Sequence, residues 1–121
     1  MVTSTKAQGD AAEDRALSYL VGRGLRVAAR NYRTPGRGGG EIDLVLWDRD
    51  GTLVFVEVRK RASRAFGGAL GSITATKQRR IVFAARHYLL RLRTQPPCRF
   101  DVVCMEESGG IQWMRAAFDA S

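Results

Sequence analysis

Cysteine, histidine and long apolar runs are scarce in this sequence, and each scarcity narrows the classes of protein to consider. The 121 residues include two cysteines and one histidine. Cys98 and Cys104 form no Cys-x-x-Cys pair, and His87 is the only histidine that could join them as a zinc ligand. This argues against a structural zinc site and predicts two reduced thiols. Residues 1–8 contain one lysine and no apolar run. We therefore expect neither a secretory signal nor a membrane span, and a cytoplasmic location.

Positive charge, in contrast, is abundant. Twenty Lys and Arg residues against twelve Asp and Glu give a formal net charge of +8. This balance favours a polyanionic partner, with nucleic acid first and an anionic membrane surface second. The alternative is a basic but merely solvated surface. The length and the 45% hydrophobic content are typical of one globular domain spanning residues 1–121.

Two segments have the apolar periodicity of amphipathic helices. Residues 10–21 place Ala12, Ala16 and Leu20 four apart, and Gly24 follows where a helix usually stops. Residues 76–93 carry a longer apolar stripe, which we expect Pro96 and Pro97 to end. The members of that stripe are Ile81, Ala84, Ala85, Tyr88, Leu89 and Leu92.

Five further segments favour β-strands, namely residues 25–33, 41–48, 52–59, 100–105 and 111–114. Residues 34–40 are rich in glycine and predict a loop. Arg49, Asp50 and Gly51 predict a hairpin turn, which makes the second and third strands antiparallel. Residues 53–56 lack a polar break, as in a central strand buried on both faces. The order helix, three strands, helix, strand and a C-terminal strand predicts an α/β fold with a mixed sheet.

Two carboxylates interrupt the apolar strands. Strict alternation would put Ile42, Leu44 and Leu46 on one face of the second strand and Asp43 on the other. Glu57 follows the buried run of the third strand, and the predicted hairpin makes it a cross-strand neighbour of Asp43.

Two neighbouring acids repel each other and are costly to bury, unless a cation or hydrogen-bond donors compensate them. A Mg²⁺ ion, or Mn²⁺ in its place, suits such a pair, because it prefers oxygen ligands and often takes one or two protein carboxylates plus a substrate phosphate. The simpler alternative is a pair of strand-end salt bridges to Arg33, Arg59 or Arg61.

Each predicted helix adds candidates to this site. Glu13 lies at the edge of the inward face of the first helix and is a third acidic candidate, although an acid in a first helical turn is also favoured by the helix dipole alone. Near the amino end of the second helix, Lys77 and Gln78 have a positional reason to approach a bound phosphate backbone. The other basic residues of that helix are expected to act non-specifically: Arg79, Arg80, Arg86, Arg91 and Arg93.

Short motifs along nearly the whole chain match one protein family. They comprise residues 9–13, 31–33, 40–45, 55–58, Arg61, Lys77, Gln78, residues 99–103, Trp113, Ala117 and Phe118. With this set the chain resembles the YraN family, small bacterial proteins with a restriction-endonuclease-like fold related to Holliday-junction resolvases. The resemblance implies that fold here.

The resemblance also implies roles for single residues. In the wider PD-(D/E)XK nuclease group, Asp43 would be the first motif acid and Glu57 the second, with the Val58 carbonyl as a further metal ligand and Glu13 as the helical acid of resolvase-like members. The motif lysine is replaced by Arg59. The expected nucleic-acid contacts are Arg33, Arg61, Lys77, Gln78 and Arg80.

The replacement at position 59 matters because a guanidinium keeps its positive charge but cannot accept a proton from water. Lys77 is the better candidate for a relocated lysine. Arg59 therefore separates two hypotheses, a Mg²⁺-dependent endonuclease acting on branched or flapped DNA, and a nucleic-acid-binding module of the same fold without cleavage. A third hypothesis is an adaptor whose basic surface meets a partner protein. Resolvase-like relatives act as dimers, so a homodimer is a further expectation, although no stretch of sequence identifies an interface.

Overall fold

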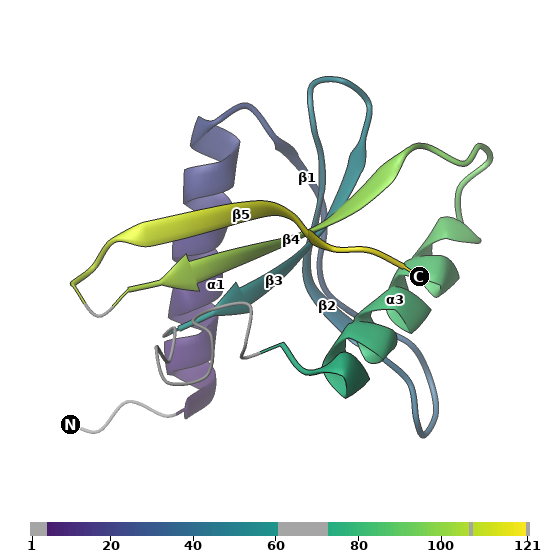
Figure 1. Ribbon diagram of the computed structural model, residues 1–121, viewed down its shortest axis with the longest axis horizontal. Helices are drawn as coiled ribbons and strands as arrows, with labels where there is room; N and C mark the ends of the chain where they lie inside the picture. The colour runs from purple at the N-terminus through teal and green to yellow at the C-terminus, as the bar shows by residue number, and fades with distance from the viewer. Residues whose placement is uncertain (1–4, 61–72, 107, 121) are drawn as a thin grey trace.

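The computed structural model describes residues 5–60, 73–106 and 108–120, with side chains from residue 10 onward. Its elements follow the predicted order (Figure 1). They are α1 (Thr5–Gly22), β1 (Arg26–Arg33), β2 (Glu41–Trp47), β3 (Leu53–Arg59), α3 (Ala75–Leu89), β4 (Cys98–Met105) and β5 (Ile111–Phe118).

The strands form one mixed sheet in the order β1-β2-β3-β4-β5. β3 and β4 are parallel, and every other neighbouring pair is antiparallel. The predicted hairpin between β2 and β3 and the central position of β3 are both confirmed. Parallel strands need a long crossover connection, and α3 lies within the one that joins β3 to β4.

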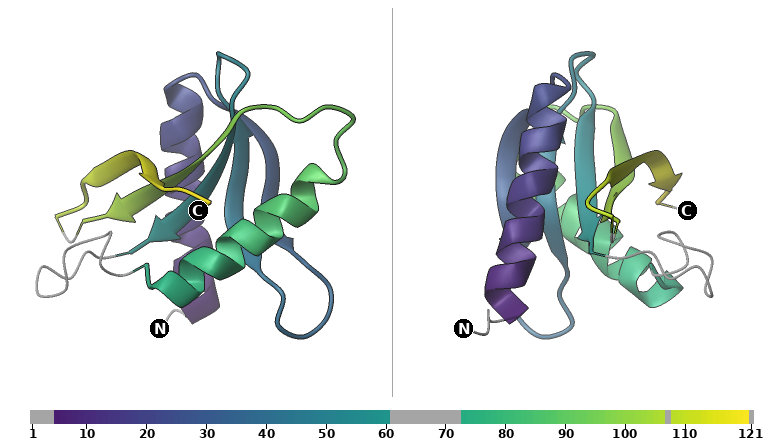
Figure 2. Two further views of the ribbon diagram at one scale, coloured as in Figure 1. Left: turned by 45° about the vertical axis from the view of Figure 1, so that its right-hand side comes forward. Right: turned by 90° about the vertical axis from the view of Figure 1, so that its left-hand side faces the viewer.

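The helices α1 and α3 cover opposite faces of this sheet (Figure 2). On one face Ala12, Ala16 and Leu20 of α1 pack with Leu44, Val54 and Val103. On the other face Ile81, Ala84 and Tyr88 of α3 pack with Val45, Phe55 and Phe100. β3 contributes to both clusters, which explains its unbroken apolar run.

Both helices differ from their predicted bounds. α1 begins at Thr5, so Glu13 lies well inside it, and the alternative that placed this acid in a first helical turn is wrong. α3 ends at Leu89 rather than at the prolines. The N–H groups of Arg91 and Leu92 bond to carbonyls three residues back, at 3.0 and 3.1 Å, and this tighter turn closes the helix.

β5 is longer than predicted because it passes through a bulge. The pairing of β4 with β5 shifts between Phe100 and Val102, and Ala116 opposite this shift has a φ of 49°. The Ala116 N–H donates to Asp101 Oδ1 at 2.9 Å, and this bond holds the irregular backbone. The strand then resumes and ends at Phe118.

The alternation of β2 breaks at the point where Asp43 lies. Leu44 and Leu46 pack on the α1 side, whereas Ile42 packs on the α3 side, so the predicted common face of these three residues is wrong. The partner strand β1 changes in step, since Tyr32, which pairs with Ile42, packs on the α3 side. Asn31, just before Tyr32, has a φ of 49°, a backbone conformation that asparagine tolerates better than most residues.

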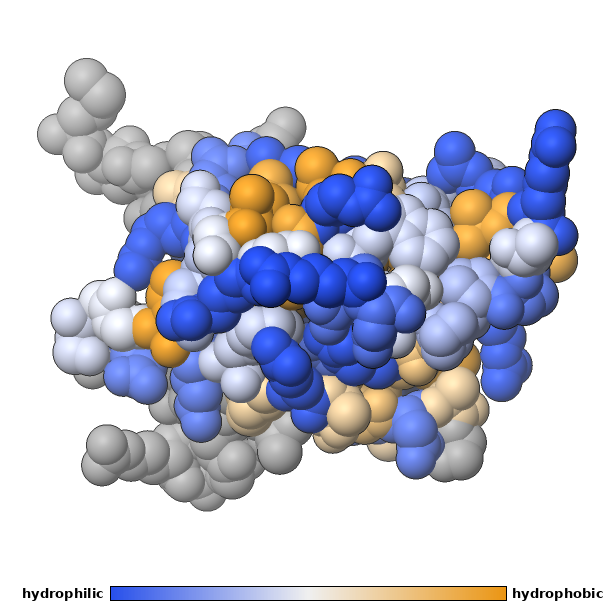
Figure 3. Space-filling model, turned by 90° about the horizontal axis from the view of Figure 1, so that it is seen from above, coloured by the Kyte–Doolittle hydropathy of each residue, from blue (hydrophilic) through white to orange (hydrophobic). Residues whose placement is uncertain are grey.

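The end of the molecule at the β2–β3 turn is mostly hydrophilic, and its apolar side chains form separate patches (Figure 3). Such scattered exposure is normal for a protein surface. Neither α1 nor α3, the helices within the described ranges, has an apolar stretch of the length that crossing a bilayer requires.

Candidate carboxylate site

The ends of β2 and β3 bring Asp43 and Glu57 together. The last regular pair between these strands is Leu44 with Val56, so the next position along sets Asp43 opposite Glu57. Beyond that pair, Asp43 Oδ2 accepts a hydrogen bond from the Val58 N–H at 2.9 Å. The Asp43 side chain thus accepts the hydrogen bond that a backbone carbonyl would accept in a regular ladder. This bond fixes one carboxylate oxygen of Asp43 beside the backbone N–H of Val58.

Glu57 is the more perturbed of the two acids. Its side chain is only 5% exposed. Burial, followed by the negative charge of Asp43, raises the pKa of Glu57 to about 7. The pKa of Asp43 is also raised, chiefly by burial, although its bond from Val58 and a hydrogen bond with Glu57 act in the opposite direction. The two carboxyls are therefore close enough to share a proton.

Lys77, at the amino end of α3, reaches this pair from a different element. Its Nζ lies 3.1 Å from Glu57 Oε1, and the Lys77 side chain is 37% exposed. Thr74 caps the helix, since its side-chain oxygen accepts from the Lys77 N–H at 3.1 Å. The cap fixes the first turn of α3 and hence the point from which Lys77 extends. Lys77 and Glu57 are far apart in sequence, but they share one site.

Arg59 lies on the same strand as Glu57 and on the same side of it. Its Nε is 3.8 Å from Glu57 Oε1, and its side chain is 23% exposed. Two cations thus face one buried carboxylate, the nearer one from α3 and the farther one from β3. We call Asp43, Glu57, Arg59 and Lys77 the carboxylate site.

Glu13 approaches Asp43 from α1. Burial and the charge of Asp43 raise the pKa of Glu13, while a hydrogen bond from Asn31 and the charge of Arg30 lower it. Glu13 Oε1 is buried without a hydrogen-bond partner among the described residues, and Arg30 Nη2 is 4.0 Å away. This acid is therefore near enough to feel the charge of Asp43.

The remaining predicted nucleic-acid contacts are distributed differently. Arg33 is exposed and pairs with Glu41 at 3.1 Å rather than with Asp43. Gln78 donates to the Ile73 carbonyl at 3.1 Å and lines a hollow on another side of α3 from Lys77. Arg80 is exposed beside the loop of residues 34–40. Arg61 lies outside the described residues.

Asn31 was missed as a candidate by the chemical arguments from the sequence. It lies where β1 crosses from one face of the sheet to the other, and its side chain hydrogen-bonds Glu13. The available signal was the residue type, because asparagine is enriched at positive φ, but nothing in an exposed strand pattern marked this position.

The donor set fits a hard divalent ion. Asp43 and Glu57 offer carboxylate oxygens, and burial raises the pKa of both, so a nearby cation would favour their ionised forms. Within the described ranges, no three His, Cys, Asp or Glu side chains are grouped to hold a metal. Two carboxylates with the remaining positions left to water and substrate match magnesium rather than a closed structural site.

Comparison with known proteins gives a consistent family match. Residues 12–105 match the model of the "Uncharacterised protein family UPF0102". A UPF0102 protein of Paracidovorax citrulli (strain AAC00-1) is 70% identical over 118 residues, covering 98% of this chain and 87% of that protein. A UPF0102 protein of Methylibium petroleiphilum (strain ATCC BAA-1232 / LMG 22953 / PM1) is 63% identical over 124 residues and is covered in full, as is this chain.

Proposed function

The chain belongs to the uncharacterised protein family UPF0102, the YraN family, and we propose that it is a metal-dependent nuclease that hydrolyses DNA phosphodiesters at the carboxylate site. Branched or flapped DNA is the proposed substrate. We also propose that its α/β core is restriction-endonuclease-like, since the motif acids lie at the ends of two adjacent strands in a sheet covered on both faces.

One observation carries the proposal, namely the pairing of two acids at a place where the fold compensates their charge only in part. Glu57 is buried beside Asp43, and its pKa is raised to about 7 despite the neighbouring Lys77 and Arg59. Strongly perturbed carboxylates with a specific charge partner are typical of functional sites. A purely structural role would favour better compensation than this.

Asp43 and Glu57 would hold the Mg²⁺ or Mn²⁺ ion, with the Val58 carbonyl as the third ligand that the family resemblance implies. When bound, the ion supplies positive charge that stabilises the charge developing on the reacting phosphate. Ionised Asp43 and Glu57 are needed for this, so the site should be most competent above the pKa of Glu57. The hydrogen bond from the Val58 N–H orients the Asp43 carboxylate without a metal.

The two cations of the site have separable roles. Lys77 Nζ, 3.1 Å from Glu57 Oε1, can donate hydrogen bonds to a phosphate oxygen or orient a water beside Glu57. Arg59 can stabilise a phosphate through its charge but cannot act as a general base. Lys77 therefore takes the position of the motif lysine in this proposal.

A second candidate is a nucleic-acid-binding module of the same fold without cleavage. The observation that favours it is the pair of cations on Glu57 Oε1, Lys77 at 3.1 Å and Arg59 at 3.8 Å. These cations compensate part of the acid's charge without any metal, as in the salt-bridge alternative.

The decisive experiment incubates the purified protein with labelled duplex, flap and four-way-junction DNA, with Mg²⁺, Mn²⁺ or EDTA. Wild type should cleave only with metal. Asp43→Asn and Glu57→Gln, which keep the shape of each side chain, should abolish cleavage but retain binding. Asp50→Asn, which changes an exposed acid at the far end of the hairpin, is the matched control and should cleave normally. Binding without cleavage under every metal condition would establish the second candidate instead.

A further inference from the structure

Two adjoining hollows extend from Lys77 of the carboxylate site to the glycine-rich loop. One hollow of about 240 Å³ is lined by Lys77 and Ile81 of α3 together with Glu41 and Arg80. A second hollow of about 400 Å³ is lined by the loop, and it shares Glu41 and Arg80 with the first. The two hollows adjoin at these shared residues. We call this surface, with Arg33, Lys77, Arg80 and residues 34–40, the basic groove.

The charges of the groove favour an anion. Arg33, Lys77 and Arg80 outnumber Glu41, which is engaged by Arg33 at 3.1 Å. Arg80 lies at the junction of the two hollows because its Nε donates to the Gly39 carbonyl at 3.2 Å. The three cations are spread along the groove, with Arg33 paired with Glu41, Lys77 paired with Glu57, and Arg80 between them.

The loop is held at its ends, and two glycines, one on either side of the exposed Arg37, leave its middle open. The Gly40 N–H donates to Thr34 Oγ1 at 2.8 Å, and a Cβ at Gly40 would lie 1.9 Å from the Arg80 carbonyl oxygen. Only glycine permits this approach of the loop to α3. Gly36 and Gly38 have φ of 85° and 71°, and the space where their Cβ atoms would be is open. At these two glycines the backbone can come close to a phosphate.

We propose that the basic groove binds the sugar-phosphate backbone of the nucleic-acid strand whose scissile phosphate enters the carboxylate site. The inference rests on the proposed function, and it assigns the glycine-rich loop and Arg80 a binding role. Lys77 connects the two surfaces, since it lines the groove and contacts Glu57. A strand that follows the groove from the loop therefore reaches Lys77, the groove residue that contacts Glu57.

The test compares two neighbouring arginines of α3. Arg80→Gln removes a groove cation, whereas Arg79→Gln makes the same charge change one residue away, at a side chain that lines the separate hollow with Phe83 and Arg86. Affinity for a short fluorescein-labelled DNA duplex and single strand is measured in EDTA at several salt concentrations. Arg80→Gln should weaken binding by about three- to tenfold and reduce the salt slope by about one phosphate contact. Arg79→Gln should weaken it by less than about twofold.

A second variant tests the loop without changing charge. Thr34→Val keeps the side-chain shape but removes the oxygen that holds Gly40, so binding should weaken by about two- to threefold with an unchanged salt slope. Circular dichroism and thermal unfolding check that each variant is folded. Equal losses of DNA affinity in Arg79→Gln and Arg80→Gln, or full affinity in Thr34→Val, would contradict the proposed binding role of the basic groove.

This test separates the groove from the proposed chemistry. Because the binding assay contains no metal, a protein that never cleaves DNA still shows whether Arg80 and Arg79 differ. The converse result is that wild type cleaves DNA with metal while Arg79→Gln and Arg80→Gln bind DNA equally well. That result would leave the nuclease proposal intact and contradict only the binding role of the basic groove.

Discussion

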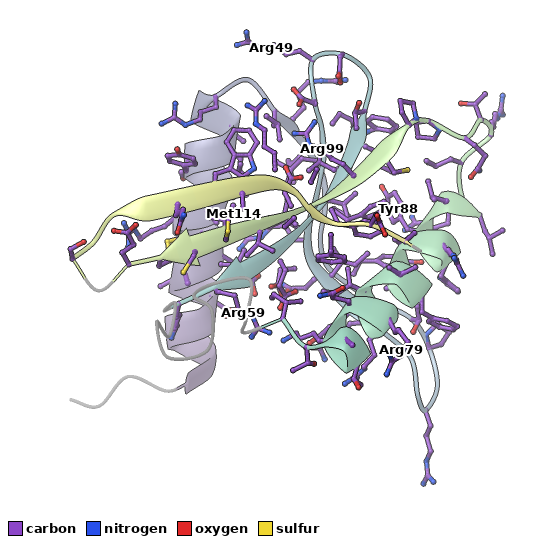
Figure 4. All side chains as sticks on the ribbon, in the orientation of Figure 1. Arg49, Arg59, Arg79, Tyr88, Arg99 and Met114 are labelled. Atoms are coloured by element: carbon purple, nitrogen blue, oxygen red, sulfur yellow. The ribbon has the colours of Figure 1, made fainter. Side chains whose placement is uncertain are left out.

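Glu57 and Asp101 are the two buried acids among the described residues, and their surroundings are opposite in kind. Asp101, on β4, accepts hydrogen bonds from Arg99 Nε at 3.1 Å, from Trp113 Nε1 at 3.0 Å and from the Ala116 N–H at 2.9 Å. Glu57 has a cation at 3.1 Å but faces a second acid. Arg99 and Arg59, which accompany these acids, lie toward different ends of the sheet (Figure 4).

The two acids differ in how fully the fold compensates their charge. Asp101 holds Trp113 and the bulge at Ala116, while Arg99 also binds Asp48 at 2.8 Å, so the fold uses every one of these bonds. We call these residues the Asp101 cluster. Glu57 instead leaves the apo protein with an acid that is hard to ionise. Such an arrangement costs fold stability, and the proposed metal-dependent function would be a physical reason to keep it.

The largest expected effect is the loss of the Asp101 cluster. Asp101→Ala should destabilise the protein by about 3–5 kcal/mol, because Arg99, Trp113 and the Ala116 N–H would lose their common acceptor, and Arg99 would keep only its bond to Asp48. Urea unfolding at pH 7 measures this directly.

Trp113→Phe is the matched control, since it removes one donor and keeps the ring, and it should cost about 1 kcal/mol. A loss under about 1 kcal/mol in Asp101→Ala would contradict the structural role given to this acid.

Replacing Glu57 should change stability in the opposite direction, and the size of the change should depend on pH. Its pKa is raised from 4.5 to about 7 on folding, so the native state binds the proton more tightly than the unfolded chain does. Stability from this group is therefore present below pH 4.5 and falls as the pH rises toward 7. Glu57→Gln should remove this loss and stabilise the metal-free protein at pH 8 by up to about 3 kcal/mol.

The measurement is the difference in unfolding free energy between wild type and Glu57→Gln from pH 4 to 8, in EDTA. The difference should grow through that window and then level off. If Glu57→Gln is instead the less stable protein at pH 8, Lys77 and Arg59 compensate the carboxylate and the salt-bridge alternative holds.

The sequence predicted the meeting of Asp43 and Glu57 and named Glu13, Arg59 and Lys77 as candidates beside them, but it did not give the contacts that these side chains make. Hairpin register follows from a local turn signal and strand length, which is why the pair could be placed opposite one another. The contact of Lys77 with Glu57 depends instead on how α3 crosses the sheet, a tertiary property that helical periodicity does not contain. The change of face at Asn31 and Ile42 was equally invisible, because strict alternation assumes a regular strand.

A smaller effect on stability is expected from metal binding at the carboxylate site. A ligand that binds only the native state at about one hundred times its Kd stabilises by about 2.7 kcal/mol. Added Mg²⁺ or Mn²⁺ should therefore raise the Tm of wild type at pH 8, and the rise should vanish in Asp43→Ala and Glu57→Ala. Asp50→Asn is the control and should respond as wild type does. An equal rise in all four proteins would place the ion elsewhere.

The smallest expected effect concerns Arg59, whose guanidinium lies 3.8 Å from the carboxylate that Lys77 contacts at 3.1 Å. Arg59→Lys introduces the lysine that a PD-(D/E)XK site would have at this position, and a lysine can orient or deprotonate a water where arginine cannot. Because Lys77 already supplies an ammonium to Glu57, the gain in metal-dependent cleavage should be only a few fold, corresponding to less than about 1.4 kcal/mol of barrier. Single-turnover rates on flap DNA measure it, and Lys77→Met tests the redundancy. Cleavage should fall steeply in Lys77→Met and recover in part in the Lys77→Met, Arg59→Lys double variant. If the double variant recovers nothing, position 59 has no share in the chemistry and its arginine is only a charge partner of Glu57.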